Sequence, residues 1–128
     1  MNFSLEKIKN LKLLIIPNGA LMPDEHVDII KQYVSMGGGL IASYETSLYD
    51  EKGLKRKDFL LADLFGAHYC GTEKTDRMEN NPRSQAYMKV EDSFKSSSFL
   101  KGIEDPVLIP AFGNYCQVKV QDSDTEKG

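Results

Sequence analysis

Two short apolar runs, LKLLIIP over 11–17 and GLIAS over 39–43, enclose a stretch with helical periodicity. The first run is continuous and ends at Pro17, which has no N–H for a sheet ladder, so it predicts a fully buried strand. The second run predicts another buried strand. Because a strand, a helix and a strand with short connections form a right-handed βαβ unit, the pattern predicts an α/β protein with a parallel sheet.

The stretch between the runs carries helix signals at both ends. Pro23 suits a first helical turn, where its missing N–H costs nothing, and Asp24 and Glu25 place negative charge at the positive end of the helix dipole. Gly37 or Gly38 can take the left-handed conformation that closes a helix. Apolar residues fall on one face at helical spacing, namely Val27, Ile29, Ile30, Tyr33 and Val34.

The rest of the sequence alternates polar loops with short ordered segments. Ser4 is expected to cap a short helical turn over 5–8 through its side-chain oxygen. A second short helix is expected over 58–66, and polar loops at 45–58 and 72–85. Strands are expected at AHYCG (67–71), AYMKV (86–90), PVLIP (106–110) and NYCQVKV (114–120). The polar tail over 121–128 is expected to be disordered.

Length, composition and charge limit the function classes. A chain of 128 residues with 41% hydrophobic and 27% charged residues fits one soluble domain with one core. The net charge is −3 and no basic face is visible, which argues against a nucleic-acid partner. The apolar runs are too short to span a bilayer, and the first residues lack the order of a signal peptide. We expect a soluble protein without a membrane partner, and the cytoplasm is slightly favoured as its compartment.

The cysteines and histidines do not form a recognisable metal or catalytic pattern. Cys70 and Cys116 fit neither a disulfide framework nor a four-ligand zinc site, so two separate buried thiols are expected. His26 and His68 lack a partner at metal-ligand spacing and are expected at the surface or half-buried. A dyad of His68 with either cysteine is an alternative. We therefore expect no metal and no cofactor.

The three glycines at 37–39 raise the question of a phosphate-binding loop. Such loops follow a strand and precede a helix, so that helix N–H groups face the phosphate. Here the order is reversed, because the glycines follow the helix and lie at its negative end. They are interpreted as the end of a helix.

The loop after the second predicted strand is the place to look for function, since α/β proteins gather functional groups past the carboxyl ends of parallel strands. It has no Gly-x-Ser-x-Gly around a nucleophile. Glu45, Asp50 and Glu51 offer carboxylates of the kind that glycoside hydrolysis uses, and Glu45 is the better candidate for a site shared with another domain. Several tyrosines could stack on sugars, with a core or interface role as the alternative: Tyr44, Tyr49, Tyr69 and Tyr115.

The stretch LKLLIIPNGALMPDEHVDIIKQYVSMGGGLIASYETSLYDEKGLKRKDFLLADLFG resembles a known domain. This is the class I glutamine-amidotransferase-like domain, or β-galactosidase trimerisation domain, of glycoside hydrolases related to family 42 β-galactosidases. The resemblance covers 5–66 well and most of the remaining chain more loosely. It implies a flavodoxin-like three-layer sandwich with a mainly parallel sheet, a single partial domain over 1–128, and truncation at the N-terminus and beyond Gly128. It also implies an upstream catalytic barrel that carries the catalytic carboxylates.

True amidotransferases carry Gly-x-Cys-x-Gly after the corresponding strand. The matching positions hold Ala42, Tyr44 and Thr46, so Tyr44 occupies the nucleophile position and thioester chemistry is not available. The chain is therefore expected to have no catalytic residues and to be a non-catalytic accessory and oligomerisation domain, forming a trimer or dimer. The candidates for lining the rim of the barrel's site are Glu45, Thr46, Tyr49 and Asp50. The alternative is a sugar or small-molecule binding module that uses the same loop.

Overall fold

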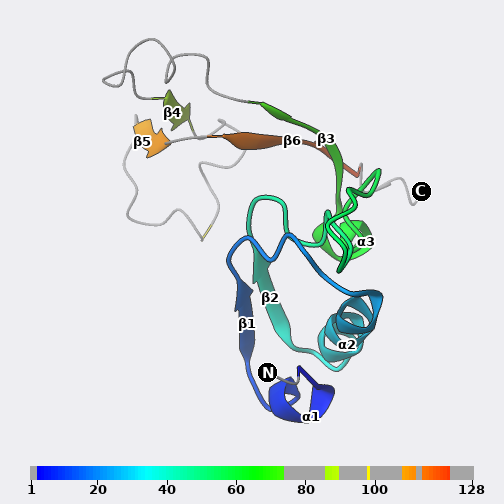
Figure 1. The fold of residues 1–128 in the computed structure, drawn as a ribbon. Coiled ribbons are helices and arrows are strands. Elements are labelled where there is room, and N and C mark those ends of the chain that lie inside the picture. The colour runs from blue at the N-terminus through cyan, green and yellow to red at the C-terminus, as the bar shows by residue number, and fades with distance from the viewer. Residues whose placement is uncertain (1–2, 74–85, 90–97, 99–107, 112–113, 122–128) are drawn as a thin grey trace, which may run out of the picture. The chain divides into compact units, whose positions relative to one another are not determined.

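The computed structural model describes residues 3–73, 86–89, 98, 108–111 and 114–121. Its elements are α1 (Leu5–Ile8), β1 (Leu13–Ile16), α2 (Asp24–Ser35), β2 (Gly39–Ala42), α3 (Ala62–Phe65), β3 (Ala67–Glu73), β4 (Ala86–Lys89), β5 (Leu108–Ala111) and β6 (Tyr115–Val120) (Figure 1). The chain divides into two parts, Met1–Thr72 with Cys116–Gly128 and Glu73–Tyr115. A single domain over 1–128 stays a prediction.

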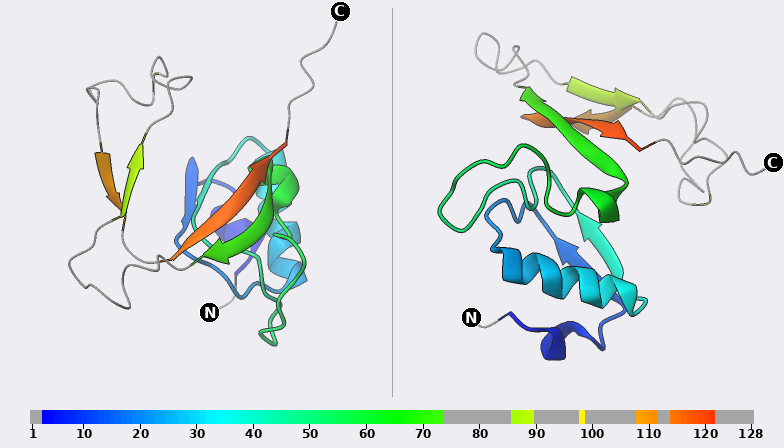
Figure 2. Two further views of the ribbon diagram at one scale, coloured as in Figure 1. Left: turned by 90° about the horizontal axis from the view of Figure 1, so that it is seen from above. Right: turned by 90° about the vertical axis from the view of Figure 1, so that its right-hand side faces the viewer.

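The predicted βαβ unit is present in the first part. Strands β1 and β2 pair in parallel, from Leu13 opposite Gly39 to Ile16 opposite Ala42, and α2 connects them. Helix α2 packs along one face of this pair (Figure 2). The core between them is a cluster of four buried residues, Met22, Val27, Ile30 and Leu61. The chain is thus an α/β protein with a small parallel sheet.

Helix α2 has the predicted face but begins one residue later than expected. Pro23 is its N-cap residue, and the Pro23 carbonyl accepts hydrogen bonds from the N–H groups of His26 and Val27 at 3.0 and 3.3 Å. Proline costs no hydrogen bond at this position, because the N–H of an N-cap residue makes no hydrogen bond within the helix. The buried face is formed by Val27, Ile30 and Tyr33.

The three glycines after α2 meet three different steric demands. Gly37 has φ of 94° and takes the left-handed conformation that was predicted to close the helix. A Cβ on Gly38 would lie 2.2 Å from the ring of Tyr33, so a larger residue would displace that buried ring. A Cβ on Gly39 would lie 3.0 Å from the Lys12 carbonyl, where the backbone enters the sheet. The run is therefore a helix end packed closely against its own helix and strand β1.

The expectation that both strands are fully buried is wrong. On the outer face of the pair, Leu13, Ile15 and Ile41 are 45%, 59% and 51% exposed. The inner face packs against the core cluster through Leu14, Ile16 and Leu40. A continuous apolar run does not reveal whether helices cover both faces or one, and here α2 covers one.

The two shorter helices differ from their predictions at their first residues. Helix α1 lies where it was expected, but the side chain of Ser4 makes no capping hydrogen bond, and the N–H of Lys7 bonds to the Ser4 carbonyl instead. Helix α3 is shorter than the predicted helix over 58–66. The N–H groups of Leu60 and Leu61 bond to the carbonyl and the hydroxyl of Ser47, which holds these residues in a turn.

The later strands were located correctly. Strands β3 and β6 pair, and their contacts show that they run antiparallel: Thr72 lies beside Cys116, and the N–H of Gln121 bonds to the Gly66 carbonyl. Strand β3 extends through Thr72 and Glu73, which the sequence places in a loop. The rest of the predicted loop over 72–85 and the tail over 122–128 lie outside the described residues. In strand β6 (Tyr115–Val120), Cys116 is the one residue that is partly buried, and the others are exposed.

The second part of the chain contains an antiparallel pair. Strands β4 and β5 are in register from Ala86 opposite Ala111 to Lys89 opposite Leu108. Both strands had been predicted from their apolar composition, so the positions of these strands are confirmed.

Candidate functional site

The loop after β2 is fixed to the loop after β1 by buried polar side chains. The hydroxyl of Thr46 accepts from the Gly19 N–H at 3.1 Å and donates to the Ser43 carbonyl at 2.7 Å. The N–H of Ser47 donates to the Gly19 carbonyl at 2.9 Å. Both Thr46 and Ser47 are buried, so the structure places Thr46 as an anchor of the loop.

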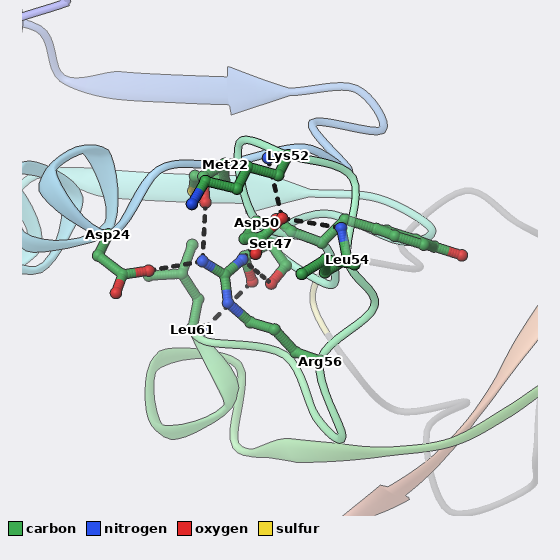
Figure 3. A network of polar contacts seen from close by, with 9 residues as sticks. Met22, Asp24, Ser47, Asp50, Lys52, Leu54, Arg56 and Leu61 are labelled. Carbon is green, nitrogen blue, oxygen red and sulfur yellow. Dashed lines mark hydrogen bonds and ion pairs between the residues drawn. The ribbon is translucent and has the colours of Figure 1, made fainter.

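Arg56 is the centre of the network that holds this loop against the start of α2 (Figure 3). One guanidinium nitrogen bonds to the carbonyls of Ser47 and Tyr49, and the other bonds to the Met22 carbonyl at 3.0 Å and to Asp24 Oδ1. The Arg56 side chain is 17% exposed. Sequence reasoning missed this residue, because LKRKD reads as a solvated charged segment.

The remaining loop candidates also shape the backbone. The Tyr49 carbonyl accepts from the Met22 N–H, and the Tyr49 N–H donates to the Ala20 carbonyl, both at 2.9 Å. These bonds extend the parallel pairing beyond the strands. The Oδ1 atom of Asp50 accepts from the N–H groups of Lys52 and Leu54 at 2.9 and 2.8 Å, which is the side-chain turn that Asp commonly forms. Tyr49 and Asp50 are partly exposed.

A residue with positive φ lies two residues beyond the end of each strand of the parallel pair. Asn18 has φ of 49° and Tyr44 has φ of 55°, a conformation that bulky residues rarely adopt. A nucleophile elbow places its nucleophile on a strained turn of this kind after a strand. The backbone at Tyr44 has this feature, while its side chain is a phenol in place of a thiol.

Glu45 is hydrogen-bonded to a polar cluster on strand β3. The hydroxyl of Thr72 donates to Glu45 Oε1 at 2.9 Å and lies 2.9 Å from the hydroxyl of Tyr69, which accepts from Lys55 Nζ at 2.7 Å. We call this chain of four side chains, Glu45, Thr72, Tyr69 and Lys55, the hydroxyl relay. The sequence separates Glu45 from Thr72 by 27 residues, so no local motif announced it.

Gly71 explains how two members of the relay meet. In a regular strand, residues three apart point to opposite faces, yet the hydroxyls of Tyr69 and Thr72 are in contact. Gly71 lies between them with φ of 155°, a backbone conformation that residues other than glycine rarely adopt. The glycine thus breaks the alternation of β3 and brings both hydroxyls to one side.

Charge and burial differ along the relay. Lys55 is exposed, and its hydrogen bond to the Tyr69 hydroxyl raises the pKa of its ammonium above the ordinary value. Cys116 is half-buried with its Sγ 3.8 Å from the Thr72 hydroxyl, and burial raises the pKa of its thiol. Cys116 is therefore a neutral neighbour of the relay at ordinary pH.

His68 pairs with a carboxylate that also supports the start of β3. The Oδ2 atom of Asp58 lies 2.6 Å from His68 Nδ1, and its Oδ1 accepts from the N–H groups of Phe59 and Tyr69 at 2.7 and 2.8 Å. Burial acts to raise the pKa of Asp58, but these hydrogen bonds outweigh it and lower the pKa below the ordinary value. The other ring nitrogen of His68 lies 3.0 Å from the Gln121 amide nitrogen.

The alternative of a cysteine–histidine dyad is not supported by these contacts. The thiol of Cys70 donates to the His68 carbonyl at 3.8 Å, away from the ring nitrogens, whose partners are Asp58 and Gln121. Cys70 is exposed, so the expectation of two buried thiols is wrong for this residue.

The described residues lack two further features, a metal site and a membrane span. No group of three or more His, Cys, Asp or Glu side chains there could hold a metal ion. None of the helices in the same part of the chain has the length and apolar character that crossing a bilayer requires.

The comparisons with known proteins found a likeness in fold and no likeness in sequence. No protein-family model matches the sequence, and no curated protein matches it. The fold is similar to that of Gan42B, a GH42 β-galactosidase from G. stearothermophilus, with a TM-score of 0.65 and 20% identity over 88% of this chain and 14% of that one. A catalytic mutant of Gan42B matches with a TM-score of 0.63 and 20% identity over 85% of this chain and 14% of that one.

This likeness is one of fold, and it concerns a small part of a long protein. The chain spans 14% of the length of the β-galactosidases that it resembles. The resemblance to proteins related to family 42 β-galactosidases is therefore confirmed at the level of the fold.

Proposed function

We propose that the chain is a non-catalytic accessory and oligomerisation domain of a glycoside hydrolase. In this proposal it is a flavodoxin-like, amidotransferase-like three-layer domain that follows a catalytic barrel. The observation that carries the proposal is the likeness in fold to part of a GH42 β-galactosidase, over 88% of this chain. Fold alone does not carry function, so the chemistry of the site must support it separately.

The side chains after β2 support the non-catalytic role. Tyr44 holds the strained position where an amidotransferase-like elbow would carry its cysteine. Thr46 is buried with its hydroxyl engaged, and Asp50 uses an oxygen to shape a turn. The polar groups of Thr46 and Asp50 therefore serve the geometry of the loop, which suits a supporting domain.

The outer face of the parallel pair supports the assembly role. Parallel sheets are usually covered on both faces, yet Leu13, Ile15 and Ile41 are about half exposed here. Contiguous exposed apolar side chains on a sheet favour association. We propose a homo-oligomer, a trimer or a dimer, and sedimentation of the chain should show self-association that Ile15→Lys reduces.

An activity assay of the isolated chain tests the non-catalytic role. We expect no turnover of aryl β-galactosides and no release of ammonia from glutamine, because the described residues offer no activated nucleophile. Turnover of either substrate that follows the chain through purification would contradict the proposal.

Within the parent enzyme, the rim role is a separate proposal. Glu45 is the strongest candidate, because one of its carboxylate oxygens is held by Thr72 and the side chain is partly exposed. Glu45→Gln in the full-length enzyme should raise KM for its saccharide and leave kcat nearly unchanged, with Glu51→Gln as the control. Unchanged kinetics would remove the rim role and leave the assembly role in place.

A further inference from the structure

The hydroxyl relay brings opposite charges and aromatic rings to one surface. Lys55 Nζ lies 4.7 Å from the centre of the Tyr69 ring and 5.8 Å from the centre of the Tyr49 ring. Lys55 is exposed, while Glu45 and both tyrosines are half-buried. The two rings thus lie beside a cation, and a carboxylate lies at the far end of the relay.

The two ends of the relay keep unused hydrogen-bonding capacity within the described part of the chain. The Lys55 ammonium has three N–H donors, and one of them is directed to the Tyr69 hydroxyl. The Glu45 carboxylate uses Oε1 for the Thr72 hydroxyl, and its Oε2 has no hydrogen-bond partner among the described residues. The relay therefore presents donors at one end and an acceptor at the other.

This arrangement selects a ligand by its charge. An anion attracted to Lys55 would be repelled by Glu45, and a cation attracted to Glu45 would be repelled by Lys55. A neutral molecule with several hydroxyl groups satisfies both ends, since each hydroxyl can donate to a carboxylate and accept from an ammonium. An aromatic ring beside such polar groups is typical of small-molecule sites.

We propose that the hydroxyl relay, together with the Tyr49 ring, is a binding site for a neutral saccharide. Hydroxyls of the sugar would donate to Glu45 Oε2 and accept from Lys55, while the apolar face of the sugar would lie on a tyrosine ring. The choice of a galactoside as the first ligand rests on the proposed function, and the charge argument requires only a neutral, polyhydroxylated ring.

Titration of the 128-residue chain with methyl β-galactoside tests the proposal, followed by amide NMR shifts and tyrosine fluorescence. We expect saturable binding with a Kd of roughly 1 mM, typical of a single small ligand with few contacts. Glucuronate and glucosamine, which carry opposite charges, should bind at least about fivefold more weakly. Absence of saturation with the galactoside, or tighter binding of either charged sugar, overturns the proposal.

Matched variants locate the site. Glu45→Gln and Lys55→Met should each weaken binding about tenfold, because each removes a charged hydrogen bond. Glu51→Gln and Lys57→Met remove the same charges from exposed positions of the same loop and should leave the Kd unchanged. Equal weakening by relay and control variants means that general charge governs binding, which overturns the assignment to the relay.

A second pair of variants separates the hydroxyl from the shape of the side chain. Thr72→Ser keeps a hydroxyl and should retain binding, whereas Thr72→Val keeps the shape and should weaken binding several-fold, about as much as one hydrogen bond contributes. If Thr72→Val unfolds the chain, the exposed Lys55→Met variant decides the question. Hydrolysis of the galactoside would contradict the accessory role and leave the binding site standing, whereas absence of binding removes the site alone.

Discussion

Lys55 and Arg56 are neighbours in one loop, yet their side chains belong to different structures. Arg56 points inward, is 17% exposed, and bonds to three carbonyls and one carboxylate. Lys55 points outward and donates to the Tyr69 hydroxyl. Successive side chains of an extended segment point to opposite sides. The same short segment therefore directs Arg56 to the interior and Lys55 to the surface.

The chemistry of the two cations matches the two positions. The planar guanidinium of Arg56 has five donors in a fixed arrangement, which suits several backbone carbonyls at once. The ammonium of Lys55 is a compact charge on a flexible stem, and most of its donors are directed to solvent. A cation whose donors are engaged stabilises the fold, whereas one with free donors is available to a ligand.

Of the variants that test this comparison, Arg56→Met is expected to lower the free energy of unfolding most. It leaves the carbonyls of Met22, Ser47 and Tyr49 without their cation, in a part-buried setting. We expect the free energy of unfolding to fall by roughly 2–4 kcal/mol, of which the exposed pair with Asp24 contributes little. Urea denaturation measures the change.

Lys57→Met is the matched control, because Lys57 is exposed in the same segment. We expect it to change the unfolding free energy by less than about 0.5 kcal/mol. If Arg56→Met were as mild as Lys57→Met, the guanidinium network would not be what holds the loop.

The βαβ unit could be predicted from sequence because its signals are local. The apolar face of α2, the charges in its first turn and the glycines after it lie within about one element of each other in the chain. The strand positions were likewise confirmed. The errors at Ile15 and Cys70 concerned burial, because periodicity does not say what covers a face.

The polar networks could not be predicted, because they depend on contacts distant in sequence. Arg56 reaches Asp24, 32 residues away, and Glu45 reaches Thr72, 27 residues away. In the sequence both Arg56 and Lys55 belong to one run of charge, which gives no sign that their roles differ. Gly71 was a usable signal, since an isolated glycine within a strand indicates a break in alternation.

A second, smaller effect compares two threonines. Thr46 is buried and its hydroxyl joins the two loops at the strand ends, whereas Thr72 lies in the partly exposed relay. Thr46→Val should lower the unfolding free energy by roughly 1–3 kcal/mol, because it removes the hydroxyl that bonds to the part-buried Gly19 N–H and to the Ser43 carbonyl. Thr72→Val should lower it by less than Thr46→Val does. Equal losses in thermal or urea unfolding would mean that the relay is as structural as the loop anchor.

The smallest expected effect is a pH dependence at Asp58. Its pKa is lowered in the folded state, so its contribution to stability is present above the unfolded pKa of about 3.9 and is lost as pH falls through the folded value. Because the Asp58–His68 pair is more than a third exposed, we expect less than about 1 kcal/mol. Unfolding free energies measured from pH 7 to pH 3 should flatten in Asp58→Asn, and an unchanged slope would assign the pH dependence to other carboxylates.

The division of roles between Lys55 and Arg56 is tested most directly by measuring stability and galactoside affinity on the same two variants. We predict that Arg56→Met lowers the urea midpoint while the folded protein at low temperature still binds methyl β-galactoside. Lys55→Met should keep the urea midpoint and weaken binding about tenfold. If Lys55→Met lost stability with its affinity, or if it bound the galactoside like the unaltered chain, the division of roles would be contradicted.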